Sequence, residues 1–247
     1  MKNLIGIIYI TYSVIIFISI MLLIFPFIIL SSVFLKKNKA RKTNLFLLKI
    51  WAKTFISFVG LSVSIKYNTP INLSKTYIYT VNHSSFLDAI AVAIVMPQSF
   101  SPLGKIEMKK IPIFGFIYSK VVITLDRKSR ESRDQSVKLL KNELLNGTSI
   151  LIFPEGTMNR TSELLTEFYD GAFRIAIETN TSILPFVISN SKKLLPADDI
   201  LKFRPGKIEV VFGNEIEVNN LKTEDLNSLK NTVRSEMYNM LIKSGSH

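Results

Sequence analysis

The sequence contains no cysteine and only two histidines in 247 residues. Without cysteine the chain can form no disulfide, no thiolate nucleophile and no cysteine-ligated metal site. His247 is the last residue, where chains are commonly unstructured, so any imidazole chemistry is expected at His83. One imidazole without cysteine leaves only carboxylates as metal ligands, and we expect neither a metal nor a cofactor.

Acidic residues are scarce relative to basic ones. Lysine and arginine number 31, aspartate and glutamate number 19, and the formal net charge is +12. A charge of this sign suits a nucleic acid, an anionic lipid surface or an acidic soluble substrate. No recognition helix, zinc-ligand spacing or aromatic RNA-binding motif occurs. We therefore expect no nucleic-acid partner and favour an anionic membrane surface.

Charge is absent altogether from Leu4 to Phe34, a stretch rich in Ile, Leu, Phe and Val. A helix of this length would extend roughly 45 Å, which exceeds the hydrocarbon core of about 30 Å, and Pro26 would kink or interrupt it. The run is too long for a signal peptide, and no cleavage pattern follows it. We predict that residues 1–35 form a membrane anchor, either a spanning helix or a hairpin that dips into one leaflet.

A basic cluster follows the anchor. Its members are Lys36, Lys37, Lys39, Arg41 and Lys42. By the positive-inside rule it places the following chain on the cytoplasmic side of the cytoplasmic membrane. The next apolar stretch, residues 45–63, carries Lys49 and Lys53 on adjacent turns. Within residues 36–68 we therefore predict an interfacial amphipathic helix rather than a second span.

From residue 69 onward, short apolar runs typical of strands alternate with amphipathic segments typical of helices. The expected strands are residues 76–81, 121–125, 149–153, 183–187 and 207–212. The expected helices are residues 86–95, 131–145, 172–178 and a last helix capped by Thr223. This alternation predicts a single α/β domain, residues 69–247, with a largely parallel or mixed sheet flanked by helices.

His83 lies in the turn between the expected strand 76–81 and the expected helix 86–95, which Ser85 can cap. Strand-to-helix turns of α/β sheets commonly carry active sites. Inside one helix, five positions would set His83 and Asp88 about 140° apart, so the two meet only if His83 precedes the helix. We predict that His83 is a general base oriented by Asp88. No complete Gly-x-Ser-x-Gly elbow occurs, so the acceptor's own hydroxyl would be the nucleophile.

A second turn of interest follows the expected strand 149–153. It reads Phe153-Pro154-Glu155-Gly156-Thr157. Its open backbone amides could bind a hydroxyl or a phosphate, and by itself it is also compatible with a simple β-turn.

Together the two blocks resemble the glycerolipid acyltransferase superfamily, specifically the 1-acylglycerol-3-phosphate acyltransferases. The likeness covers about residues 75–190. It includes Asn82-His83 through Asp88, Gly104-Lys105, Pro112 to Gly115, Leu125-Asp126-Arg127, Phe153 to Thr157, Phe168 with Gly171-Ala172-Phe173, and Ile183-Leu184-Pro185. Four motifs in the family's order and spacing make the resemblance specific.

The resemblance implies transfer of an acyl chain from a thioester, on acyl carrier protein or coenzyme A, to the sn-2 hydroxyl of 1-acylglycerol-3-phosphate. The product would be phosphatidate, and acceptor and product would stay in the bilayer. His83 would be the base and Asp88 its partner. The implied substrate-binding residues are Asn82, Arg127, Glu155, Gly156, Thr157, Arg160 and Pro185. The acidic donors and the lipid acceptor both suit a basic, anchored chain.

Two departures from the family pattern bear on the acceptor. Met158 stands where relatives often have arginine, and Tyr169-Asp170 stands where many have a lysine. An acidic residue beside a phosphate is unfavourable unless it points away. The phosphate would then be held by Arg127 and Arg160, with Arg174 or Lys105 as further candidates.

Two other functions remain open at this point. One is acylation of a lyso-aminolipid, such as a lyso-ornithine lipid, whose ammonium group Asp170 would suit. The other is non-enzymatic binding of anionic lipid through the basic surface.

Overall fold

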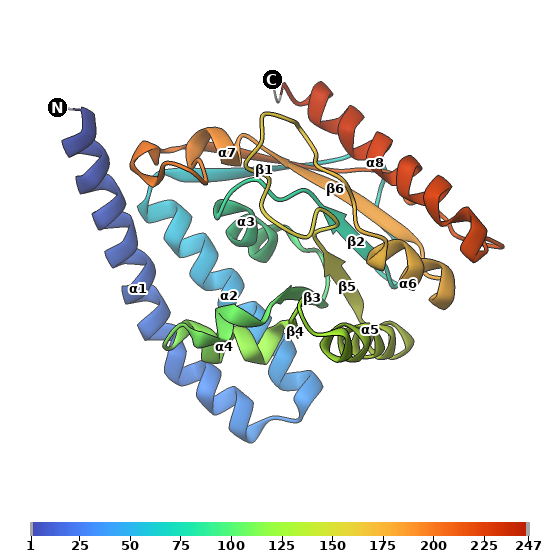
Figure 1. The fold of residues 1–247 in the computed structure, drawn as a ribbon. Helices are drawn as coiled ribbons and strands as arrows, with labels where there is room; N and C mark the ends of the chain where they lie inside the picture. Colours follow the sequence, from blue (N-terminus) through green and yellow to red (C-terminus); the bar gives the residue numbers. More distant parts are fainter. Residues whose placement is uncertain (1, 246–247) are drawn as a thin grey trace.

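The computed structural model describes residues 2–245, so His247 lies outside the described residues. A seven-stranded sheet has the order β1-β7-β6-β2-β5-β3-β4 (Figure 1). Its strands are β1 Leu61–Tyr67, β2 Ile78–Val81, β3 Phe100–Lys105, β4 Ile123–Leu125, β5 Ser149–Ile152, β6 Ile183–Ser189 and β7 Gly206–Phe212. Five neighbouring pairs are parallel, and β6 with β7 is antiparallel. The predicted α/β class with a largely parallel sheet is confirmed.

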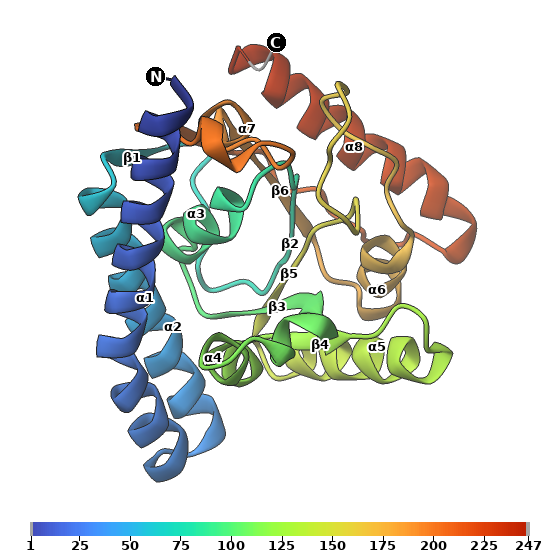
Figure 2. The same ribbon diagram turned by 60° about the vertical axis from the view of Figure 1, so that its left-hand side comes forward.

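Helices cover both faces of this sheet. They are α1 Lys2–Phe34, α2 Lys37–Phe58, α3 Leu87–Val95, α4 Phe114–Val121, α5 Arg130–Leu145, α6 Gly171–Thr179, α7 Ser191–Leu194 and α8 Leu226–Lys243. Three short 3₁₀ turns join them: η1 Ile106–Lys110, η2 Ile200–Lys202 and η3 Thr223–Asp225. Helices α1 to α4 lie on one side, whereas α5, α6 and α8 lie on the other (Figure 2).

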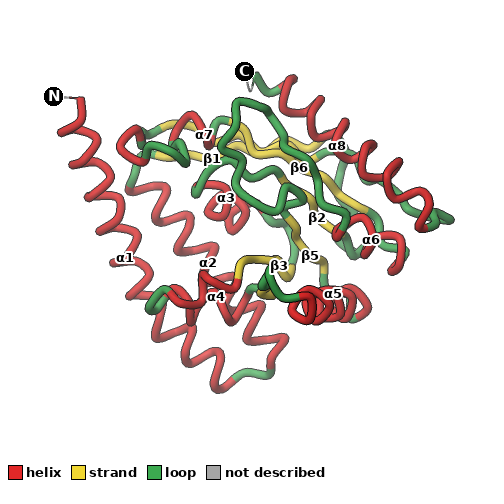
Figure 3. The backbone as a smooth tube through the Cα atoms, viewed as in Figure 1, coloured by secondary structure: helices red, strands yellow, loops and turns green. Residues whose placement is uncertain are grey.

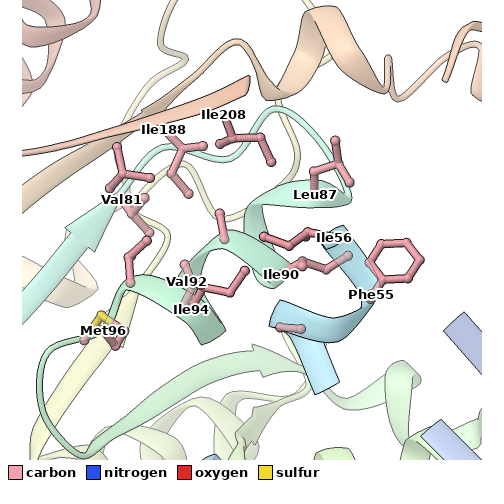
Figure 4. Close-up of a cluster of buried hydrophobic side chains, with 14 of the residues drawn as sticks. Phe55, Ile56, Val81, Leu87, Ile90, Val92, Ile94, Met96, Ile188 and Ile208 are labelled. Atoms are coloured by element: carbon pink, nitrogen blue, oxygen red, sulfur yellow. The ribbon is translucent and has the colours of Figure 1, made fainter. Parts of the chain in front are cut away.

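Side-chain alternation along β2 separates the two hydrophobic cores. Tyr79 and Val81 pack in the core that α2 and α3 cover, and Ile78 packs in the core that α5, α6 and α8 cover. In the first core, α3 lies between the sheet and α2, as Figure 4 shows for Ile90. A four-residue strand buried on both faces is typical of the centre of a parallel sheet, and it holds the turn that follows β2 rigidly.

Helices α1 and α2 form an antiparallel hairpin. The Tyr9 hydroxyl donates to the Val59 carbonyl, and the Trp51 indole donates to the Phe17 carbonyl at 3.3 Å. Near the bend, Ser31 donates to the side chain of Asn44. The α1 helix continues through Pro26, so of the kink or interruption predicted there, the interruption is absent.

The rest of the hairpin differs from the predicted layout in one respect. The helix expected over residues 45–63 ends at Phe58, because Gly60 turns the chain with φ +66°. Residues Leu61–Tyr67 then form β1, which pairs in parallel with β7. The sheet therefore begins before residue 69, and the helices of residues 2–58 share its core.

Candidate active site

The candidate residues follow the carboxyl ends of neighbouring parallel strands. His83 comes two residues after β2, Glu155 three residues after β5 and Arg127 two residues after β4, while Lys105 ends β3. Carboxyl ends of parallel strands lie at one edge of the sheet, where α/β proteins place their binding sites. The long loop from β5 to α6 crosses this edge (Figure 3).

His83 and Asp88 are in direct contact. The His83 Nδ1 atom lies 3.0 Å from Oδ2 of Asp88. Helix α3 begins at Leu87, so His83 lies outside the helix and Asp88 within its first turn. The His83 side chain is 22% exposed, whereas Asp88 is fully buried. Among the described residues Nε2 of His83 has no hydrogen-bond partner, so this nitrogen can meet a substrate.

The Asp88 carboxylate is held by backbone as well as by the imidazole. The N–H groups of Ser84 and Ser85 donate to Oδ2 at 2.6 and 2.8 Å. The Ser85 hydroxyl accepts a hydrogen bond from the N–H of Leu87, as expected of a residue at a helix start. With its carboxylate fixed in this way, Asp88 can set the tautomer and orientation of the imidazole.

The β5–α6 loop binds the backbone of His83 through two hydrogen bonds. Its N–H donates to Oε1 of Glu155 at 2.8 Å, and its carbonyl accepts from the N–H of Asn159 at 2.6 Å. Oε2 of Glu155 accepts from the N–H and the hydroxyl of Thr166, both at 2.9 Å. Because Glu155 is only 2% exposed and both its oxygens have protein donors, its contacts are those of a positioning residue.

Asn82 and Pro185, both predicted to bind substrate, make their contacts with or within strand β6. The Asn82 amide donates to the Ile188 carbonyl at 3.0 Å and accepts from the Ile188 N–H at 2.8 Å. These two bonds tie the turn after β2 to β6. Pro185 is buried within β6, opposite Thr80 of β2. The structure thus gives Asn82 a positioning contact and places Pro185 in the sheet.

Arg127 and the Gly156 turn are brought together. Gly156 has φ +68°, and a Cβ there would lie 3.6 Å from Nη1 of Arg127 and 2.8 Å from the ring of Tyr169. This conformation favours glycine, and a Cβ here would displace the Tyr169 ring. Arg127, Thr157 and Arg160 are exposed, so their polar groups are available to a ligand.

The half-buried Tyr118 packs against β3. The hydroxyl of Tyr118 would be 1.9 Å from a Cβ on Gly104, so this close approach requires glycine. Burial raises the pKa of Tyr118 to about 12, Glu107 adds to the rise, and Arg127 opposes it. The phenol is therefore neutral at physiological pH. It packs against Gly104 of β3 without adding a charge.

Asp170 points away from the site. Its carboxylate lies 2.7 Å from the Lys230 ammonium of α8, and its carbonyl accepts from the N–H of Arg174. Arg174 itself is exposed on α6. An acidic group that already has a cationic partner neither repels a phosphate strongly nor offers a free site to an ammonium group. In the described part of the chain, no group of three or more His, Cys, Asp or Glu is arranged for a metal.

Asn159, Thr166 and Phe153 were not among the predicted site residues. The His83 ring packs against Phe153 with centroids 4.5 Å apart. The Asn159 side chain accepts from the N–H of Thr161 and donates to the Glu163 carbonyl. An asparagine in a polar loop often makes such turn contacts, but the sequence contains no sign that its backbone reaches His83.

The chain is similar in sequence to known acyltransferases. The family described as Acyltransferase matches residues 62–189, slightly more than half of the chain. The chain is 32% identical over 190 residues to the 1-acyl-sn-glycerol-3-phosphate acyltransferase of Saccharomyces cerevisiae, covering 75% of this chain and 62% of that protein. It is 29% identical over 178 residues to the chloroplastic 1-acyl-sn-glycerol-3-phosphate acyltransferase LPAT1 of Arabidopsis thaliana, covering 71% and 49%. The chain thus spans about half to three fifths of these relatives.

A solved structure shares the whole fold. The crystal structure of the 1-acyl-sn-glycerophosphate acyltransferase of Thermotoga maritima superimposes with a TM-score of 0.82. The superposition covers 100% of this chain and 99% of that one at 21% sequence identity. The likeness therefore includes the α1–α2 hairpin as well as the sheet.

Proposed function

Because the chain belongs to the acyltransferase family, we propose that it transfers a fatty acyl chain from an acyl thioester to the sn-2 hydroxyl of 1-acylglycerol-3-phosphate. The product would be phosphatidate, a step of phospholipid biosynthesis. The observation that carries this proposal is the His83–Asp88 contact of 3.0 Å, with Nε2 unpartnered in the described residues at the carboxyl edge of the sheet. The named activity of the relatives supports the same reaction.

The proposed reaction needs one group that acts first as a general base and then as a general acid. Nδ1–H of His83 donates to Asp88, which leaves Nε2 to take the proton of the acceptor hydroxyl. The hydroxyl oxygen attacks the thioester carbonyl, and the carbon–sulfur bond breaks as the ester forms. The imidazolium, stabilised by the Asp88 carboxylate, returns the proton to the departing thiolate. The hydrogen bonds that the His83 backbone makes with Glu155 and Asn159 keep the imidazole in place throughout the reaction.

The charges around the site support an acceptor that carries a phosphate. Arg127 beside the Gly156 turn, with exposed Arg160 and Thr157 nearby in sequence, suits a phosphate monoester. The ion pair between Asp170 and Lys230 removes the reason to favour an aminolipid acceptor. Lysophosphatidate is therefore the acceptor that the site supports best.

We also propose that α1 and α2 hold the protein on an anionic membrane as a hairpin in one leaflet, with the sheet on the cytoplasmic side. Helix α1 is long and apolar enough to cross a bilayer. However, its backbone at Gly6 meets the Leu201 carbonyl, and Phe25 packs on Phe116 of α4 with ring centroids 5.6 Å apart. If α1 crossed the bilayer, one of its ends would lie far from the sheet and lose its contact.

The activity is tested with the purified protein in lipid vesicles. It is offered acyl carrier protein or coenzyme A thioesters together with lysophosphatidate, a lyso-ornithine lipid or a neutral 1-acylglycerol. We expect phosphatidate as the main product and no acyl transfer by His83→Ala. Failure to form phosphatidate with either donor would overturn the proposed function, and a fully active His83→Ala would overturn the proposed base.

The membrane arrangement is tested separately, and the absence of cysteine makes this simple. A single cysteine at exposed Ile5 or exposed Phe34 is treated with an impermeant thiol reagent in sealed vesicles of known orientation. A hairpin in one leaflet leaves both positions on the same side. Labelling of Ile5→Cys only from the side opposite Phe34→Cys would show a spanning helix instead.

A further inference from the structure

The positive charge of the chain is concentrated in two blocks. Residues 36–53 contain seven Lys or Arg and no acid, a net charge of +7. Residues 105–138 contain nine Lys or Arg and four Asp or Glu, a net charge of +5. Together they account for the whole formal charge of +12, so the remaining residues are neutral as a set. Each block therefore needs its own explanation.

The first block lies against the apolar hairpin. It occupies the bend after α1 and about the first three quarters of α2, Lys37–Phe58. Arg41 of this block is buried and pairs with Glu143 of α5. The other six cations lie beside an exposed apolar helix, an arrangement that suits an anionic lipid surface. The membrane proposed above therefore explains these six.

The second block extends to the N-terminal part of α5, away from helix α1. Helix α5 packs on β3, β4, β5 and α6, whereas α1 packs on α2, α4 and η2. Helix α2 contacts α5 near its other end, where Arg41 pairs with Glu143. Figures 1 and 2 both draw α1 and α5 at opposite sides of the molecule. We define the α5 basic surface as Lys128, Arg130, Arg133 and Lys138, all of which are exposed. None of the four has a carboxylate at ion-pairing distance among the described residues.

The position of two of these cations is unfavourable for helix α5 itself. Ser129 caps α5 by accepting from the N–H of Ser132 at 3.1 Å, and Arg130 is the first helical residue. The N-terminus of a helix carries a partial positive charge, so cations there are unfavourable and anions are favourable. Arg130 and Lys128 lie at this end with Glu131 as the acidic residue of the first turn. A negatively charged partner would offset the repulsion.

The α5 basic surface is continuous with the candidate active site. Arg127 is adjacent in sequence to Lys128, and its carbonyl accepts a hydrogen bond from the Arg133 guanidinium. The guanidinium of Arg127 in turn lies beside the Gly156 turn. A partner seated on this surface would hold whatever it carries at the rim of the site.

Resting on the proposed function, we propose that the α5 basic surface docks the acyl donor as an acidic protein that carries the acyl chain by a thioester. A protein donor must be recognised over an area wider than the site, and opposite charges steer such encounters and fix their orientation. Acyl carrier protein has this chemistry. The donor then approaches from the α5 side while the lipid acceptor enters from the hairpin side.

The test uses the full chain in vesicles and a charge reversal away from the catalytic residues. The variant is Lys128→Glu/Arg130→Glu. The control is Lys66→Glu/Lys243→Glu, which makes the same charge change at exposed positions of β1 and α8. Initial rates are measured with acyl carrier protein and with acyl-coenzyme A, and binding of acyl carrier protein is measured by fluorescence anisotropy.

We expect the variant to raise the KM and the Kd for acyl carrier protein by about tenfold or more, with kcat/KM for acyl-coenzyme A changed less than about threefold. The control should match the unaltered protein with both donors. Unchanged binding of the carrier protein, or an equal loss with both donors, would overturn the proposal. Loss of vesicle binding by the variant would show that this surface binds the membrane, and this result would also overturn the proposal.

These outcomes are separate from those of the proposed function. If the unaltered protein forms no phosphatidate with either donor, the proposed function fails. The anisotropy titration still decides the docking proposal, since it requires no turnover.

Discussion

The carboxylate of Glu155 accepts a hydrogen bond from the backbone N–H of His83 at 2.8 Å. The two residues are 72 positions apart and belong to different sequence motifs. Asn159 completes the contact by donating its N–H to the His83 carbonyl. The turn after β5 is therefore a support for the base as well as a rim of the site, and the two motifs act as one unit.

The Glu155 contact leads to a prediction that separates positioning from substrate binding. Glu155→Gln leaves one oxygen for the two sets of donors, from His83 and from Thr166, so one set loses its acceptor. We expect kcat to fall about 100-fold, as for a small displacement of a catalytic group, with the KM for lysophosphatidate changed less than about threefold.

The matched control for this prediction is Glu167→Gln, an exposed glutamate in the same loop, which should keep full activity. Steady-state kinetics with both variants provide the measurement. A large rise in KM with unchanged kcat would instead support the role in substrate binding that the sequence predicted for Glu155.

The sequence predicted the turn between His83 and Asp88 well because the signals for it are local. The Ser85 cap and the apolar pattern placed a helix start between His83 and Asp88, and the helix begins at Leu87. It missed β1, because apolar residues continue past Gly60 into Leu61–Val63 and this glycine is the only local sign of a helix end. The pairing of β1 with β7 is set by residues some 145 positions away.

The sequence was less informative about where side chains point. Glu155 and Asn82 are in the expected turns, but their hydrogen bonds run to backbone that is distant in sequence. Asp170 was a reason to doubt a phosphate acceptor, and its partner Lys230 is 60 residues away. Such contacts depend on tertiary packing, which composition and spacing do not encode.

The strength of His83 as a base is expected to depend on Asp88. In Asp88→Asn the amide oxygen can take the position of Oδ2, where it still accepts from Nδ1 of His83 and from the N–H groups of Ser84 and Ser85. The imidazolium formed in the reaction would then lose the negative charge that stabilises it, and His83 would be a weaker base. We expect kcat to fall about 100-fold or more while the KM values for both substrates stay similar.

Thermal unfolding of Asp88→Asn should remain cooperative, so that loss of activity is not loss of fold. Asp199→Asn, on the surface at η2, provides the matched control. Appreciable activity of Asp88→Asn at neutral pH would contradict the assigned roles of the pair.

The Asp170–Lys230 ion pair gives a prediction about acceptor choice. Because this pair is partly exposed, at 49% and 23%, Asp170→Asn should lower the free energy of unfolding by less than about 1 kcal/mol. The carboxylate points to α8, so the preference for lysophosphatidate over a lyso-aminolipid should stay within about twofold. Competition between the two acceptors in one assay measures this ratio, and a marked shift toward the phosphate acceptor would show that Asp170 does face the site.

Arg127 is expected to hold the acceptor's phosphate, because its guanidinium lies beside the Gly156 turn. Hydrogen bonds to charged groups contribute about 1.5–3 kcal/mol, so Arg127→Ala should raise the KM for lysophosphatidate about tenfold to a hundredfold. A neutral 1-acylglycerol lacks the phosphate, and its weaker use should be unaffected by the substitution. Arg174→Ala, which removes an exposed arginine from α6, is the matched control. An equal loss with both acceptors would mean that Arg127 acts on the donor or on the fold rather than on the phosphate.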